Sequence, residues 1–70
     1  MTNFINANLT GATLMNIDLS HKSFNGAKLI GTWLCGSNLT DADFRNSHIY
    51  GANFFDTIMT GADFSKMNLS

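Results

Sequence analysis

Large apolar residues recur at every fifth position along this chain. Fourteen of them follow one another from Phe4 without an insertion or a deletion. In a helix each step of five rotates a side chain by about 140°, and in a strand an odd step moves it to the opposite face. We expect this inward series to form the structural core: Phe4, Leu9, Leu14, Leu19, Phe24, Leu29, Leu34, Leu39, Phe44, Ile49, Phe54, Met59, Phe64 and Leu69.

The residues between the members of the inward series indicate a turn in every repeat. The position two after each member is Gly, Asn or Asp in eleven of thirteen cases, and it holds all six glycines of the chain. These residue types accept left-handed backbone conformations that branched residues resist. The position two before each member is mostly Ala, Ser or Thr. The pattern therefore predicts short sides joined by corners, with the large and the small residue both inside.

A second spacing, of twenty residues, predicts how many sides close one coil. Four sides of five residues per coil, stacked ~4.8 Å apart, give an all-β solenoid of about three and a half coils in which neighbouring coils hold one another. Residues 1–70 then form a single domain of fourteen repeats with no linker. The spacing is carried by two sets of residues: Phe4, Phe24, Phe44 and Phe64, and Gly11, Gly31 and Gly51.

The repeats resemble the pentapeptide-repeat family, whose motif is commonly written A(D/N)LXX. Matching segments are ANLTG at 7–11, SNLTD at 37–41, ADFRN at 42–46, ANFFD at 52–56 and ADFSK at 62–66. The resemblance covers the whole chain. It implies a right-handed quadrilateral β-helix in which the central Leu or Phe and the small residue two before it point inward.

Three residues depart from the family pattern at the small inward position: Ile17, Lys22 and Met67. Burying an unpaired ammonium group is costly. We therefore expect Lys22 to bend outward and the backbone around His21 and Lys22 to be locally distorted.

Charge and cysteine content narrow the possible partners and location. Five Asp and four Lys or Arg give a net charge of −1, which argues against direct nucleic-acid binding. A single cysteine allows no intrachain disulfide, so the reducing cytoplasm is the expected location. The first twenty residues resemble neither a secretion signal nor a membrane span, and we expect no membrane association.

No residue pattern in the chain indicates catalysis. His21 and His48 lie on different sides of the predicted coil, with no Cys or carboxylate cluster at ligand spacing, so we expect no metal or other cofactor. Cys35 lacks a neighbouring general base. Asp41 and Asp43 could suggest a pair of carboxylates for general acid–base catalysis, but a convex wall with a filled interior leaves no cleft for a small-molecule substrate. We expect the protein not to be an enzyme.

Several outward positions on two adjacent sides are apolar. In this register Phe54 and Met59 point inside, whereas Phe55 and Ile58 face solvent. Exposed apolar patches usually mark partner surfaces, with Trp and Tyr as typical anchors, although scattered apolar residues on a surface are also ordinary. The first interpretation predicts a non-catalytic protein-binding or scaffold module with a protein partner of unknown identity. We call the following set the apolar strip: Met15, Ile30, Trp33, Cys35, Tyr50 and Phe55.

Acidic residues suggest an alternative function. Asp41, Asp43 and Asp63 are expected near one corner, with Arg45 close by. Some members of the family inhibit or protect DNA gyrase by mimicking duplex DNA, so the resemblance makes a DNA mimic that binds gyrase or another topoisomerase the second hypothesis. Asp also simply suits corner and outward positions, and five Asp offset by four basic residues imitate a duplex poorly.

Neither end of the predicted coil carries an evident capping segment. Raw coil ends present unpaired backbone groups and apolar surface. We therefore expect end-to-end self-association, or that the chain is part of a larger assembly or of a longer protein.

Overall fold

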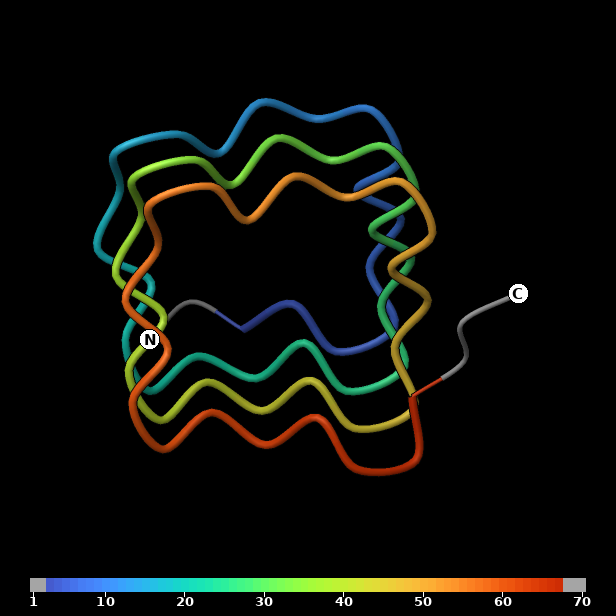
Figure 1. Cartoon of the computed structure of the whole chain (residues 1–70). Helices are drawn as coiled ribbons and strands as arrows, with labels where there is room; N and C mark the ends of the chain where they lie inside the picture. Colours follow the sequence, from blue (N-terminus) through green and yellow to red (C-terminus); the bar gives the residue numbers. More distant parts are fainter. Residues whose placement is uncertain (1–2, 68–70) are drawn as a thin grey trace.

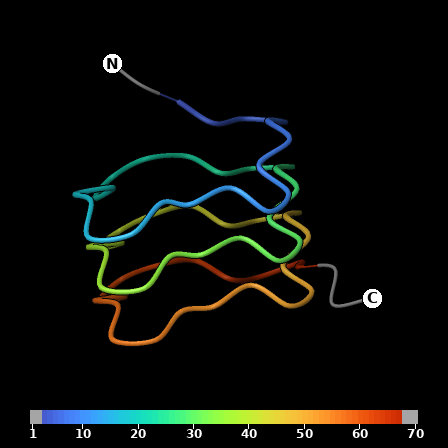
Figure 2. The same cartoon turned by 90° about the horizontal axis from the view of Figure 1, so that it is seen from above.

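The chain winds into stacked four-sided coils. A computed structural model describes residues 3–67; Figure 1 looks along the coil axis and shows the square outline, and Figure 2 shows the coils stacked on one another. Within these residues there is no helix and no strand longer than a single bridge. Eight parallel β-bridges, from Asn8 with Lys28 to Asp43 with Asp63, each join residues twenty positions apart. The predicted coil of twenty residues is therefore confirmed.

We number the four sides in chain order by the inward residues on which they are centred. Each side faces outward through the residue just before its central residue, and these outward residues form the bridges between coils. Side one is centred on Phe4, Phe24, Phe44 and Phe64, side two on Leu9, Leu29 and Ile49, side three on Leu14, Leu34 and Phe54, and side four on Leu19, Leu39 and Met59.

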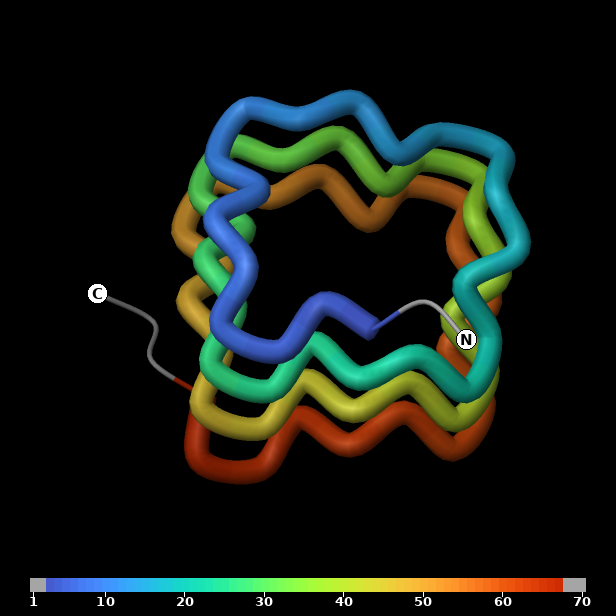
Figure 3. Tube along the Cα trace, turned by 180° about the vertical axis from the view of Figure 1, so that it is seen from behind, coloured from blue at the N-terminus to red at the C-terminus, as the bar shows by residue number. Residues whose placement is uncertain are grey.

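Every corner uses the same backbone conformation. The residue two after each central residue has a positive φ, between +57° and +75°, in all thirteen turns, and seven of these residues are not glycine. In eleven turns the next amide donates to the carbonyl of the central residue, as from Ala7 to Phe4 at 3.0 Å. A four-residue turn that is closed by this hydrogen bond and has a positive φ at its third residue is a type II β-turn. Figure 3 shows the corners of successive coils lying over one another.

Backbone hydrogen bonds tie each coil to both neighbours. The amide of Leu34 donates to the carbonyl of Asn53 in the following coil at 2.9 Å, and the amide of Trp33 donates to that of Ala12 in the preceding coil at 2.9 Å. Because the same pairs recur on every side, the register between coils is fixed at twenty residues.

The inward series fills the interior, most completely in the middle coil. Six members are buried: Leu19, Phe24, Leu29, Leu34, Leu39 and Phe44. Six more are half-buried and lie at the first or last described level of their sides: Phe4, Leu9, Leu14, Ile49, Phe54 and Phe64.

One described member of the inward series is exposed. The prediction that Met59 lies in the core is wrong, because its side chain is 39% exposed. Met59 occupies the last level of side four, where no further described coil covers it. Leu69 lies outside the described residues.

The phenylalanines of side one form a continuous stack. Neighbouring rings from Phe4 to Phe64 have centroids 4.8–5.0 Å apart and are parallel within 6°. Phe54 packs edge-on against Phe44, with centroids 6.0 Å apart. The ring spacing matches the spacing of paired strands, so the aromatic contacts and the backbone hydrogen bonds impose the same rise.

Buried hydroxyl groups are satisfied by backbone carbonyl groups. Thr32 Oγ1 donates to the carbonyl of Leu9 at 2.7 Å, and Ser47 Oγ donates to that of Phe44 at 2.6 Å. Among the described residues no buried side-chain nitrogen or oxygen lacks a partner. Small polar residues therefore fit the interior without the cost of an unpaired polar group.

The departure from regular geometry lies at Ile17 more than at Lys22. Around Lys22 the turn hydrogen bond to Leu19 measures 3.3 Å, close to the 3.2 Å of three other turns, and the bonds to the next coil persist. The φ of His21 is +60°, as at the other corners, so the prediction of a distorted backbone around His21 and Lys22 is wrong. At Ile17 the side chain is 40% exposed, and its amide bonds to Ser37 Oγ at 3.1 Å. Ser37 Oγ also donates to the carbonyl of Leu14. The serine hydroxyl thus bridges a turn that the larger isoleucine opens.

The phenylalanine stack predicts a strong dependence of stability on its central ring. We expect Phe44→Ala to lower the free energy of unfolding by about 3–5 kcal/mol, because it removes a buried ring and leaves a cavity. The exposed Phe55→Ala is the control and should change it by less than about 0.5 kcal/mol. Urea unfolding followed by circular dichroism measures both, and equal losses would contradict the assigned register.

The corners predict unequal costs for two glycine substitutions. Gly61 and Gly51 have φ of +75° and +73°, so alanine at either should cost about 1–2 kcal/mol. A Cβ at Gly61 would also require the carboxylate of Asp41 in the preceding coil to rotate away, at a small additional cost, whereas at Gly51 the nearest atom is 3.7 Å away. We therefore expect Gly61→Ala to have the lower unfolding midpoint in urea. Adding Asp41→Ala to both variants should remove the difference, and a lower midpoint for Gly51→Ala would refute this explanation.

Candidate protein-interaction surface

The apolar strip lies on the outer wall of side three and on its two corners. Trp33 is the central outward residue of side three and forms bridges to Thr13 and Asn53. Trp33, Tyr50 and Phe55 are 49%, 66% and 75% exposed. Met15 and Ile30 are also exposed, whereas Cys35 is half-buried. Five of the six residues of the strip are therefore exposed on side three or at its corners, and Cys35 is partly covered.

The backbone beneath the apolar strip is held by hydrogen bonds on both sides. The amide of Trp33 donates to Ala12, and the amide of Phe55 donates to Asn53 Oδ1 at 2.9 Å. The same local bond recurs at other outward positions, as from Thr40 to Asn38 Oδ1 at 3.0 Å. The large aromatic side chains therefore stand on a regular, hydrogen-bonded wall.

One exposed residue beside the apolar strip was not included in it. Ile58 is 55% exposed and lies on side four, three residues after Phe55. The sequence predicted that Ile58 faces solvent but grouped only sides two and three. An apolar residue at an outward position usually occupied by a polar one was the signal that could have extended the surface around this corner.

The wall that carries the apolar strip is almost free of charge. Side three and its corners comprise residues 10–16, 30–36 and 50–56, in which Asp56 is the one charged residue. The other eight charged residues of the chain lie on the remaining three sides and their corners. The interior of protein interfaces is likewise depleted of charge and enriched in aromatic residues.

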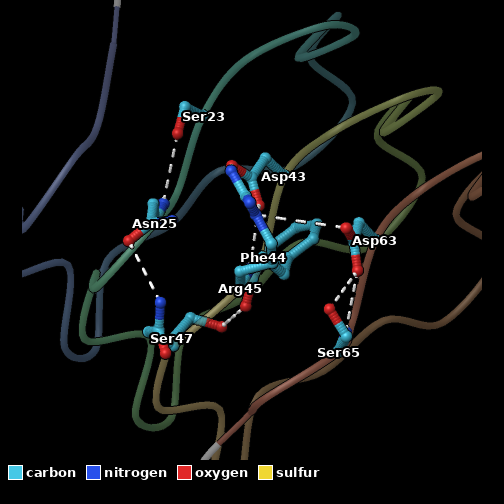
Figure 4. Close-up of polar contacts among 9 residues, drawn as sticks. Ser23, Asn25, Asp43, Phe44, Arg45, Ser47, Asp63 and Ser65 are labelled. Atoms are coloured by element: carbon cyan, nitrogen blue, oxygen red, sulfur yellow. Dashed lines mark hydrogen bonds and ion pairs between the residues drawn. The ribbon is translucent and has the colours of Figure 1, made fainter.

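The three acidic residues of the alternative hypothesis do not form one cluster. Asp43 and Asp63 are bridge partners on side one, and Arg45 lies between them (Figure 4). Arg45 Nε and Nη2 each donate to Asp43 at 2.9 Å, and Nε is 4.0 Å from Asp63 Oδ2. Asp41 instead faces His21, with Nδ1 and Oδ2 3.6 Å apart.

Hydrogen bonds lower the pKa of the two carboxyl groups on side one. The guanidinium of Arg45 is the main reason that the pKa of Asp43 falls to about 2. The hydroxyl of Ser65 donates to Asp63 Oδ1 at 2.7 Å and is the largest cause of the lowered pKa of Asp63. Both groups are therefore anionic at neutral pH, but a bidentate arginine offsets the charge of Asp43.

The remaining surface offers no enclosed site within residues 3–67. No pocket opens in this part of the chain. The same residues contain no group of three His, Cys, Asp or Glu side chains that could hold a metal ion. No helix among them is long and apolar enough to cross a membrane.

Comparisons with known proteins identify a family. The family model described as pentapeptide repeats (8 copies) matches three overlapping segments, residues 2–41, 23–61 and 37–70. Proteins of this kind are generally structural or binding modules. A search of curated protein sequences found no significant match.

Solved structures of pentapeptide-repeat proteins have a similar fold. Rfr23 from the cyanobacterium Cyanothece 51142 is 27% identical with a TM-score of 0.88, and the match covers 93% of this chain and 45% of that one. QnrB1, a plasmid-mediated fluoroquinolone resistance protein, is 20% identical with a TM-score of 0.58, covering 96% and 38%. This chain thus spans less than half of either protein.

These likenesses imply a right-handed quadrilateral β-helix. The parallel bridges at a spacing of twenty residues and the positive φ at every corner agree with this architecture. Because the repeat profile also matches nearly the entire sequence, the chain belongs to the pentapeptide-repeat family.

Proposed function

We propose that this protein is a non-catalytic binding or scaffold module that recognises a protein partner through the apolar strip. The observation that carries the proposal is the combination of three exposed aromatic residues, Trp33, Tyr50 and Phe55, with a wall that has a single charged residue. Exposing such rings to water is unfavourable, and a partner that covers them gains the free energy of their burial.

The fold supports this function through its rigidity. Trp33 and Phe55 stand on backbone that is hydrogen-bonded to neighbouring coils or to adjacent side chains. Aromatic side chains have few rotatable bonds, and a fixed backbone loses no further freedom when a partner binds. The backbone that carries these anchors is therefore ordered before a partner binds, and only the side-chain rotamers remain to be fixed.

The alternative is a DNA mimic that acts on gyrase or another topoisomerase. Its support is the fold that the chain shares with the fluoroquinolone resistance protein QnrB1, at 20% identity. The charge distribution favours it less, because Arg45 pairs with Asp43 and Asp41 faces His21. A surface that imitates duplex DNA needs closely spaced negative charge, and here each potential stretch is interrupted by a basic group.

A capture experiment tests the binding function. Immobilised wild-type protein and Trp33→Asp/Phe55→Asp should be exposed to a lysate of the source organism, and bound proteins quantified by mass spectrometry. We expect partners of the wild type to fall at least tenfold with the variant, because two charges are placed in the apolar contact. The control Ser23→Asp/Ser65→Asp adds the same charge on side one and should retain them. Retention by both variants would refute the role of the strip.

A supercoiling assay separates the two functions. Under our proposal, Asp41→Lys/Asp43→Lys/Asp63→Lys leaves partner capture unchanged, and neither this variant nor the wild type alters gyrase activity with or without a quinolone. Inhibition or protection by the wild type that disappears in the variant would instead establish the DNA-mimic function. Circular dichroism confirms that the variant keeps the coil.

A further inference from the structure

The apolar strip lies between two flanks of opposite charge. Side two carries Lys28 and His48, which are bridge partners, and Lys28 is exposed. Side four carries Asp18, and Asp56 lies at the corner between sides three and four; both are exposed. In Figure 1 sides two and four are opposite walls of the square. Side three therefore has a basic flank on one hand and an acidic flank on the other.

The two flanks match in height along the coil axis. A coil of twenty residues rises ~4.8 Å, so ten residues correspond to a rise of only ~2.4 Å. Asp18 and Lys28 are ten residues apart, and His48 and Asp56 are eight apart. Each basic residue thus has an acidic residue at nearly its own level on the far flank.

We propose that the apolar strip binds a second copy of this chain, side three against side three, about a two-fold axis parallel to the coil axis. The inference rests on the proposed binding function and specifies its partner. A rotation about such an axis preserves height and exchanges the two corners of side three. The corner between sides two and three of one copy then faces the corner between sides three and four of the other.

This symmetry places apolar residues opposite apolar residues. Trp33, near the middle of the wall, faces Trp33 of the second copy. Tyr50 faces Phe55 of the second copy, and Ile30 faces Cys35, in each case with a difference of five residues or ~1.2 Å in height. Each corner contact occurs twice, as required of an isologous interface.

Charge selects this axis over the alternative in which the coils run antiparallel. With the coils parallel, the flank of each copy that carries Lys28 lies on the same edge of the interface as the flank of the other that carries Asp18 and Asp56. With an axis perpendicular to the coil axis, the flank carrying Lys28 and His48 would face itself, as would the acidic flank. Like charges at an interface are unfavourable, so the parallel arrangement is preferred.

The size of the wall sets the strength of the association. The molecule measures 24 × 20 × 19 Å, so one wall buries less than the roughly 800 Å² per partner of a standard interface. We therefore expect a reversible dimer that dissociates on dilution and weakens with salt.

Sedimentation equilibrium from micromolar to millimolar protein at low salt tests the dimer. The wild type should shift from 7.7 kDa toward twice that mass. Trp33→Asp should weaken association at least tenfold, whereas Ser23→Asp, with the same charge on the opposite wall, should not. A monomer throughout the range would overturn the inference and leave the capture experiment on other proteins unaffected. A dimer that survives Trp33→Asp would overturn it in favour of the coil ends.

Mixing charge variants tests the orientation. Lys28→Asp alone places two acidic flanks together, and Asp18→Lys alone places two basic flanks together, so each should associate less than the wild type. In an equimolar mixture the acidic variant meets the basic one at both flanks, and association should recover to at least the wild-type level. Failure of the mixture to recover would overturn the parallel arrangement, as would recovery when Lys28→Asp is mixed with wild type alone.

Discussion

A left-handed residue at every fifth position is the constraint on which the rest of this structure depends. Each such residue closes a turn that keeps the large residue two before it and the small residue after it inside the coil. Four of these turns return the backbone over itself, where its amide and carbonyl groups find partners one coil away. Without the turn, a period of five would scatter the apolar residues over all faces of a helix or strand.

The same constraint decides where function can lie. The lumen is filled by the inward series, and Phe24 and Phe44 are fully buried in a stack with the spacing of the backbone bridges. A narrow, packed interior leaves no space for a substrate, so recognition falls to the outer walls. On those walls the fold fixes the position and height of each outward residue but accepts many types of side chain there. The charge and the apolar character of the outward residues can therefore differ from one side to another.

The five-residue period of apolar residues and the residue types at the corners were enough to predict the coil, its register and its buried centre. They were enough because the same pattern recurs in every repeat, so each repeat independently indicates the same geometry. The errors lie where a residue's environment depends on its level in the stack or on a neighbour in the next coil. Met59 follows the inward pattern but is exposed because no described coil covers it. The opened turn at Ile17 depends on the hydroxyl of Ser37 twenty residues later, a contact that no local pattern contains.

The proposed interaction surface was predictable only as a set of outward residues, since the function proposed for it depends on a partner. A comparison of equivalent positions in successive coils nevertheless shows which of these outward residues the fold does not require. Thr13, Trp33 and Asn53 occupy equivalent positions in successive coils of side three, with the same bridge pattern. The fold therefore accepts a small polar residue where it carries an exposed tryptophan. Because folding does not require this ring and its exposure is unfavourable in water, its presence supports the proposed interaction, which would cover it.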